Sequence, residues 1–191
     1  MVTGMRRAKQ PVSALLAGPY GHPFHPMLVT VPIGAWFVSL GFDIASHLVS
    51  NPGFLARGSQ WLIAVGVVGA IAAGLVGFLD LAAIPGGTVA FRTACTHMCI
   101  NLLVTTGYAA NFAWRYHEHA DRASVGAGMI ALSASCATAL SVSGYLGGKL
   151  TYRYGVRVAT EVSQADGYLA PGMQLSGGHH ADRGRRGRRD S

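Results

Sequence analysis

Charged residues are scarce in this sequence: they make up 12% of its 191 positions, whereas soluble domains carry about a quarter. Hydrophobic residues make up 50% of the chain. A chain with so little charge cannot cover the surface of a soluble domain in the usual way. The composition therefore indicates a membrane protein.

Cysteines and catalytic motifs are scarce as well. The three cysteines, Cys95, Cys99 and Cys136, lie inside apolar stretches, which argues against a disulfide framework of the secreted type. The sequence has no phosphate-binding glycine loop, no nucleophile elbow and no HExxH zinc motif. A hydrolase or transferase is therefore not expected. Whether the protein is an enzyme stays open, and an enzyme would be an oxidoreductase component.

What the sequence does contain is long apolar stretches, at residues 27–49, 61–84, 94–114 and 124–146. Each has the ~20 residues that a helix needs to cross ~30 Å of hydrocarbon. Because lipid offers no hydrogen-bond partners to the backbone, helices are the expected form. The prediction is an all-α fold, a four-helix transmembrane bundle with up-down-up-down order.

Basic residues determine the expected orientation, because cytoplasmic loops carry an excess of them. Near the ends of the apolar stretches, one side has Arg6, Arg7, Lys9, Arg92, Lys149, Arg153 and Arg157, and the other has Arg57, Arg115 and Arg122. This excess places both termini in the cytoplasm and the protein in a bacterial plasma membrane. The predicted parts are a cytoplasmic N-terminal segment (1–19), a four-helix membrane domain (20–158) and a tail (159–191).

The tail over residues 159–191 is polar, basic and rich in glycine. It has no periodic apolar pattern and is predicted to be disordered. No aromatic residue interrupts the basic run after Tyr168, so nucleic-acid binding is not favoured. The partner that the whole chain predicts is the lipid bilayer.

Small residues recur every four positions in the second apolar stretch. They form two ladders, Gly66, Ala70, Gly74 and Gly69, Ala73, Gly77. This spacing places each ladder on one helix face, where a second backbone can approach closely. The ladders indicate either tight helix packing or a flat face for a planar cofactor.

The stretch GHPFHPMLVTVPIG, residues 21–34, places His22 and His25 just before the first apolar stretch. Each is followed by proline, which disfavours helical backbone in the residue before it, so both are expected to be extended. Asp80 and His97 fall on the same predicted side of the membrane. Because the helices of a bundle face a common axis, these four residues predict a His/Asp cluster at the cytoplasmic edge.

Two interpretations of this cluster concern its own residues. The first is structural: the side chains hydrogen-bond the kinked helix ends. The second is binding of haem b or a divalent metal ion, with His25 and His97 as the ligands and His22 and Asp80 in support. Imidazole is a common ligand of metal ions and of haem iron, and a carboxylate often orients the second imidazole nitrogen.

A third interpretation is a proton or ion pathway that connects the cluster to the other side of the membrane. Asp43 and His47 lie four residues apart on one face of the first predicted helix. Asn101 lies one turn beyond His97 in the third. Polar residues inside membrane helices face the bundle interior and are often functional.

The histidine-proline motif resembles the signature of a family of small bacterial membrane proteins known as domain of unknown function 2231. The resemblance covers about residues 20–158 and rests on His22-Pro23, His25-Pro26, Pro32-Ile33-Gly34, Asp43, GFLDLAAIP with Asp80, His97 with Asn101, and residues 147–158. It implies a four-helix membrane protein of unassigned function. Some members carry Rieske or cytochrome-like modules, which implies redox partners.

Together these features predict a multi-pass inner-membrane protein that binds haem b or a metal ion and is associated with membrane electron transfer. Its predicted partners are a respiratory or redox membrane complex and, as a homo-oligomer, further copies of itself. The alternative is a non-catalytic structural or accessory subunit of a larger membrane complex.

Overall fold

The computed structural model describes residues 2–118 and 124–169 of the chain. Within these ranges the fold is all-helical and has no strands, in agreement with the predicted fold class. The chain divides into two units, Met1–Val158 and Ala159–Ser191. The first unit contains every candidate site residue named above.

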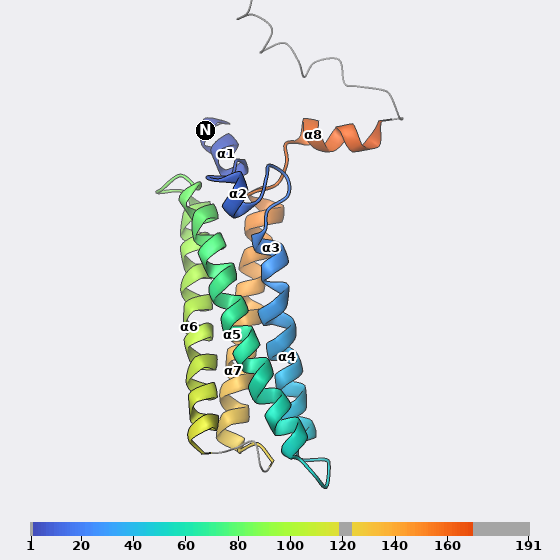
Figure 1. Ribbon diagram of the computed structural model, residues 1–191. Helices are drawn as coiled ribbons and strands as arrows, with labels where there is room; N and C mark the ends of the chain where they lie inside the picture. The colour runs from blue at the N-terminus through green and yellow to red at the C-terminus, as the bar shows by residue number, and fades with distance from the viewer. Residues whose placement is uncertain (1, 119–123, 170–191) are drawn as a thin grey trace, which may run out of the picture. The chain divides into compact units, whose positions relative to one another are not determined.

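The first unit combines short N-terminal helices with four long ones. The short helices are α1 (Val2–Lys9), α2 (Ala14–Ala17) and α3 (His25–Leu28). The long helices are α4 (Thr30–Ala45), α5 (Gly53–Ala82), α6 (Val89–His117) and α7 (Ala127–Gly148), and α7 continues as the π-helical turn η2 (Lys149–Arg153). The long helices lie side by side (Figure 1), with α4 and α6 each packed against both α5 and α7.

Among the described residues, three segments are long and apolar enough to cross a membrane. They are His25–Ala45, Gly53–Ala82 and Ala127–Arg153. Helix α6 has 29 residues but is not among them. The polar residues in its sequence, including His97, Asn101 and Arg115, lower its hydropathy.

Aromatic stacking lies at the centre of the packed helices. Trp36 of α4 is buried and stacks on Tyr108 of α6, with ring centroids 4.2 Å apart and planes 11° apart. The indole lies directly against Gly66 of α5, where a Cβ atom would overlap it. The face at Gly66 is therefore filled by a neighbouring side chain, as the tight-packing interpretation of the ladders requires.

The second unit contains a short helix, α8 (Glu161–Ala165), followed by the single 3-10 turn η3 (Asp166–Tyr168). Part of the tail predicted to be disordered, residues 159–191, is thus helical. The remainder of that prediction, from residue 170 onward, lies outside the described residues.

Candidate functional site

The histidine pair His25 and His97 lies at one end of the long helices. His25 is the first residue of α3, and His97 lies about two turns into α6. Their rings meet edge to face, with centroids 6.4 Å apart and planes 86° apart. The prediction of extended backbone at His25 is wrong: Pro26 occupies the first turn of α3, where its missing N–H removes no helical hydrogen bond.

Helix α5 holds the ring of His25. Its Nδ1 lies 2.9 Å from the carbonyl oxygen of Ala73. Because a carbonyl only accepts, Nδ1 carries the proton and Nε2 presents a lone pair. Gly77 makes room for the ring, since a Cβ atom there would lie 2.9 Å from Cε1 of His25.

Helix α7 holds the ring of His97 in the same tautomer. Its Nδ1 lies 2.8 Å from the carbonyl oxygen of Ser143 and therefore donates to it. Asn101, one turn further along α6, donates from Nδ2 to Nε2 of His97 over 3.1 Å. Both imidazoles thus have Nδ1–H fixed by a backbone carbonyl of another helix, and both present Nε2 as an acceptor.

The other two members of the predicted cluster have different partners. His22 is exposed, and its Nδ1 lies 3.4 Å from the carbonyl oxygen of Tyr20. Asp80, near the end of α5, forms an ion pair with Arg157, with 2.8 Å between Oδ1 and Nε. Across residues 2–118 and 124–169, no group of three or more His, Cys, Asp or Glu side chains is arranged to hold a metal ion. The cluster is therefore reduced to a histidine pair.

Arg157 has a role that the sequence analysis missed. There it was counted only among the basic residues that indicate membrane orientation. Its side chain is buried, and its φ of 61° lies in the left-handed region that non-glycine residues rarely adopt. Its Nη2 donates to the carbonyl oxygens of Ala17 and Gly18 over 2.7 and 2.8 Å. Arg157 thereby connects the N-terminal segment to Asp80 on α5.

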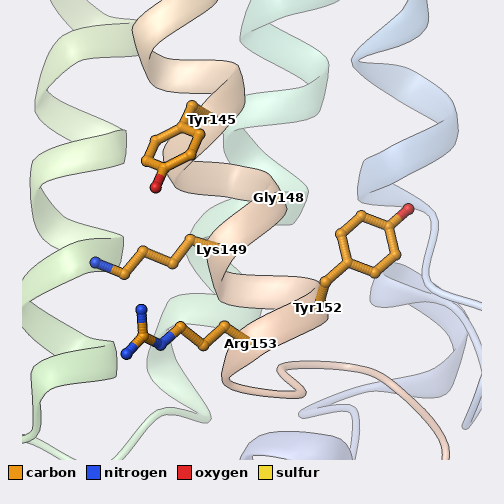
Figure 2. A pocket seen from close by; sticks show the side chains of 5 residues that line it. All are labelled: Tyr145, Gly148, Lys149, Tyr152 and Arg153. Atoms are coloured by element: carbon orange, nitrogen blue, oxygen red, sulfur yellow. The ribbon is translucent and has the colours of Figure 1, made fainter.

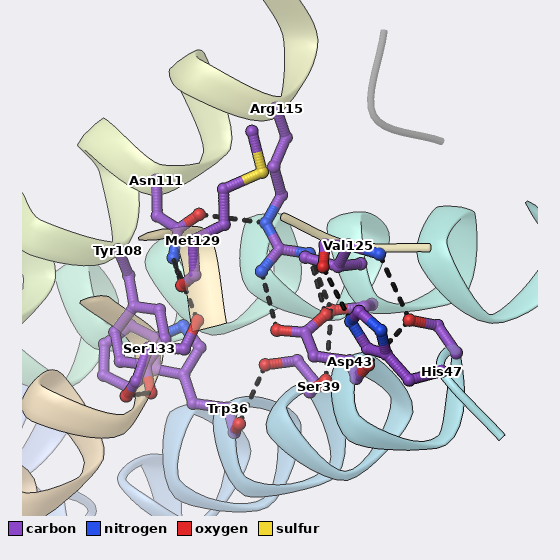
Figure 3. Close-up of polar contacts among 12 residues, drawn as sticks. Trp36, Ser39, Asp43, His47, Tyr108, Asn111, Arg115, Val125, Met129 and Ser133 are labelled. Atoms are coloured by element: carbon purple, nitrogen blue, oxygen red, sulfur yellow. Dashed lines mark hydrogen bonds and ion pairs between the residues drawn. The ribbon is translucent and has the colours of Figure 1, made fainter. Parts of the chain in front are cut away.

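A second polar cluster lies at the opposite end of the long helices and is built around Asp43 of α4 and Arg115 of α6 (Figure 3). The two side chains form a bidentate ion pair, with Nη1–Oδ1 and Nη2–Oδ2 distances of 2.8 and 2.6 Å. Ser59 of α5 donates its hydroxyl to Asp43 and accepts from Nη1 of Arg115. All three side chains are 0–1% exposed, so the two charges neutralise each other in the protein interior.

Asn111 extends this cluster to α7. Its Oδ1 accepts from Nε of Arg115 over 2.9 Å, and its Nδ2 donates to the hydroxyl of Ser133 and to the carbonyl of Met129. All four long helices thus contribute to one buried network. The sequence analysis followed the polar residues of this helix only from His97 to Asn101. Further helical steps along the same side, to Tyr108, Asn111 and Arg115, would have found the rest.

Asp43 and His47 do not pair with each other as their spacing suggested. His47 instead lies with Nε2 2.8 Å from the carbonyl oxygen of Val125. Asn101, the third residue of the predicted pathway, contacts His97 at the far end of the helices. The proton or ion pathway stays a prediction. In the structure, each of its three residues has a different hydrogen-bond partner.

Comparison with known proteins identifies the family of this chain. Residues 21–160 match a family described as "Predicted membrane protein (DUF2231)". No curated protein and no solved structure matches the chain. The match covers most of the sequence and includes both histidines, Asp43 and Arg115. The chain therefore belongs to this family of membrane proteins of unknown function, as its histidine-proline motif indicated.

Proposed function

We propose that the protein is a multi-pass protein of the bacterial plasma membrane in which α4, α5, α6 and α7 all cross the bilayer in up-down-up-down order. Burial of the polar residues of α6 supports a fourth crossing. Tyr108, Asn111 and Arg115 are at most 1% exposed, whereas Leu102 and Leu103 are 61% and 73% exposed. The polar face of α6 is covered by other helices, so an apolar face remains for lipid.

The proposed orientation, with both termini in the cytoplasm, rests on the count of basic residues near the apolar stretches. Arg115 and Arg157 are buried in ion pairs and no longer count. One of them was counted on each side of the membrane. Near the apolar stretches this leaves six basic residues on the cytoplasmic side against two on the other. The bias that the positive-inside rule uses is therefore unchanged.

The function that the geometry supports best is ligation of a haem b iron, or of another transition-metal ion, by His25 and His97. The carrying observation is that each Nδ1–H is fixed by a carbonyl of a neighbouring helix. Metal-bound histidines are oriented in this way, with the other nitrogen left for the metal. The two rings lie close together, with centroids 6.4 Å apart, so one bound group would be within reach of both.

Haem b fits this pair better than a bare ion. Structural metal sites commonly need four protein ligands, whereas the porphyrin supplies most ligands of a haem iron, so His25 and His97 would be enough to hold it. When bound, haem would supply one-electron chemistry, which favours a component of a membrane electron-transfer chain. The chain's own contribution is to hold both imidazoles in one tautomer. His97 would hold the group through Nε2, the nitrogen that accepts from Asn101 in this structure.

The test is the visible spectrum of the purified full-length protein with and without dithionite, together with elemental analysis for iron, zinc and copper. We expect a haem spectrum that is lost in His25→Ala and in His97→Ala. His22→Ala is the matched control, because His22 is exposed and outside the pair, and it should keep the spectrum. Haem retained in the His25→Ala, His97→Ala double variant would contradict the assignment.

The second candidate is a non-catalytic structural or accessory subunit of a larger membrane complex. It is favoured by the completeness of the hydrogen bonds at the pair, since His97 uses both ring nitrogens within the protein. A folded protein that is colourless and free of metal would support this candidate. Partners that copurify with it would then identify the complex.

A further inference from the structure

A basic groove lies where α7 passes into η2 (Figure 2). It has a volume of about 530 Å³ and is lined by Tyr145, Gly148, Lys149, Tyr152 and Arg153. The side chains of Lys149 and Arg153 lie next to each other on the same side of the helix, with Tyr145 one turn away. The segment Ala127–Arg153, which is long and apolar enough to cross a membrane, ends here, so a bilayer that it crosses has its edge at the groove.

The two cations of the groove, Lys149 and Arg153, have no carboxylate partner within residues 2–118 and 124–169. The contact recorded for Lys149 is with the ring of Tyr154, at 5.8 Å from Nζ to the centroid. Arg153 is exposed. By contrast, the buried Arg115 and Arg157 are paired with Asp43 and Asp80.

The local helix geometry brings the two cations together. In the π-helical turn, the backbone N–H of Tyr154 bonds to the carbonyl of Lys149, five residues earlier. Residues four apart lie on the same face of a helix, so Lys149 and Arg153 form one positive surface. Single π-helical turns within α-helices occur frequently at functional sites.

We propose that this groove binds the phosphate of an anionic phospholipid in the adjoining leaflet. Lysine and arginine supply the charge and the donors that a phosphate needs. Tyr145 and Tyr152 are 73% and 90% exposed, and aromatic rings of this kind settle at the level of lipid headgroups. Because the groove is bordered by aromatic side chains at the membrane edge, a lipid fits it better than a free phosphate ion.

The experiment is native mass spectrometry of the full-length protein in mild detergent, with phosphatidylglycerol and phosphatidylcholine of matched chains. We expect the wild-type protein to retain phosphatidylglycerol preferentially. Lys149→Gln and Arg153→Gln should each weaken that binding about fivefold, and the double variant about 25-fold. Lys149→Arg preserves the charge and should preserve binding.

The matched control is the Arg6→Gln, Arg7→Gln double variant, which removes the same charge from exposed residues of α1. It should keep the preference for phosphatidylglycerol. An equal loss in both double variants would mean only general attraction to anionic lipid and would overturn the proposal. Displacement of the lipid by millimolar inorganic phosphate would also overturn it, by indicating a site for the free ion.

This inference is independent of the proposed haem function. The groove contains neither His25 nor His97. Substitutions in the groove should therefore leave the visible spectrum unchanged, and the histidine variants should leave lipid retention unchanged. Failure of one proposal can thus be distinguished from failure of the other.

Discussion

At the scale of single residues, the chain places two arginines where neither can be solvated. Arg115 is 1% exposed and Arg157 is 4% exposed, and each is paired with an aspartate that is distant in sequence. Removing one partner of a buried pair leaves an uncompensated charge, which costs far more than the pair itself contributes. The stability of the protein therefore depends on keeping each arginine together with its aspartate.

This asymmetry gives a prediction for the Asp43–Arg115 pair. Asp43→Ala should destabilise the protein by about 3–5 kcal/mol, because the guanidinium of Arg115 stays buried without its carboxylate. The double variant Asp43→Leu, Arg115→Met should recover much of that loss, since no charge then remains buried. Thermal unfolding in detergent measures both.

The control for this prediction is Glu118→Gln, which removes an exposed acid just after α6. Its effect should stay within about 1 kcal/mol, as for other exposed charges. If the double variant were as unstable as Asp43→Ala, the buried charge would not be the cause of the loss.

At the scale of helices, α5 determines how closely the others approach. Gly66 receives the indole of Trp36, and Gly77 receives the imidazole of His25. Gly74 lies on the same helix but has nothing within 4 Å of the position of a Cβ atom. The small residues of α5 are therefore not equivalent, although their spacing is regular.

Substitution of these glycines tests the packing directly. Gly66→Ala should destabilise the protein by about 1–3 kcal/mol, because the new methyl group overlaps the indole of Trp36. Gly74→Ala is the matched control and should be neutral or stabilising by up to ~1 kcal/mol, since alanine favours helix. Equal melting temperatures for the two variants would contradict the packing of Trp36 against α5.

At the scale of the whole molecule, the polar contacts divide between the two ends of the long helices. One end has the histidine pair, the Asp80–Arg157 pair and the basic groove. The other has the network around Asp43 and Arg115. If all four long helices cross the bilayer, these two ends lie on opposite sides of the membrane.

Reporter fusions test this topology. A reporter that is active only in the cytoplasm should be active after Gly87 and after Val158, and inactive after His117. One that is active only outside should show the reverse, because α6 separates Gly87 from His117. Outside activity after Val158 would invert the orientation. Equal activity at Gly87 and His117 would mean that α6 does not cross.

By itself the sequence determined the membrane class, the helical fold, the family and the nearness of His25 to His97. The membrane class and the helical fold follow from composition and apolar length, and the family follows from the histidine-proline motif. The nearness of the two histidines follows because both lie at the same end of the predicted helices.

Only the tertiary structure decided which polar residues are partners. Asp43 shares a helix face with His47 yet binds Arg115, and Asp80 binds Arg157 rather than a histidine. The physical reason is that helical spacing determines the face on which a side chain lies, but not which helix packs against that face. Pairings across 72 or more positions of sequence depend on how four helices rotate and slide against one another.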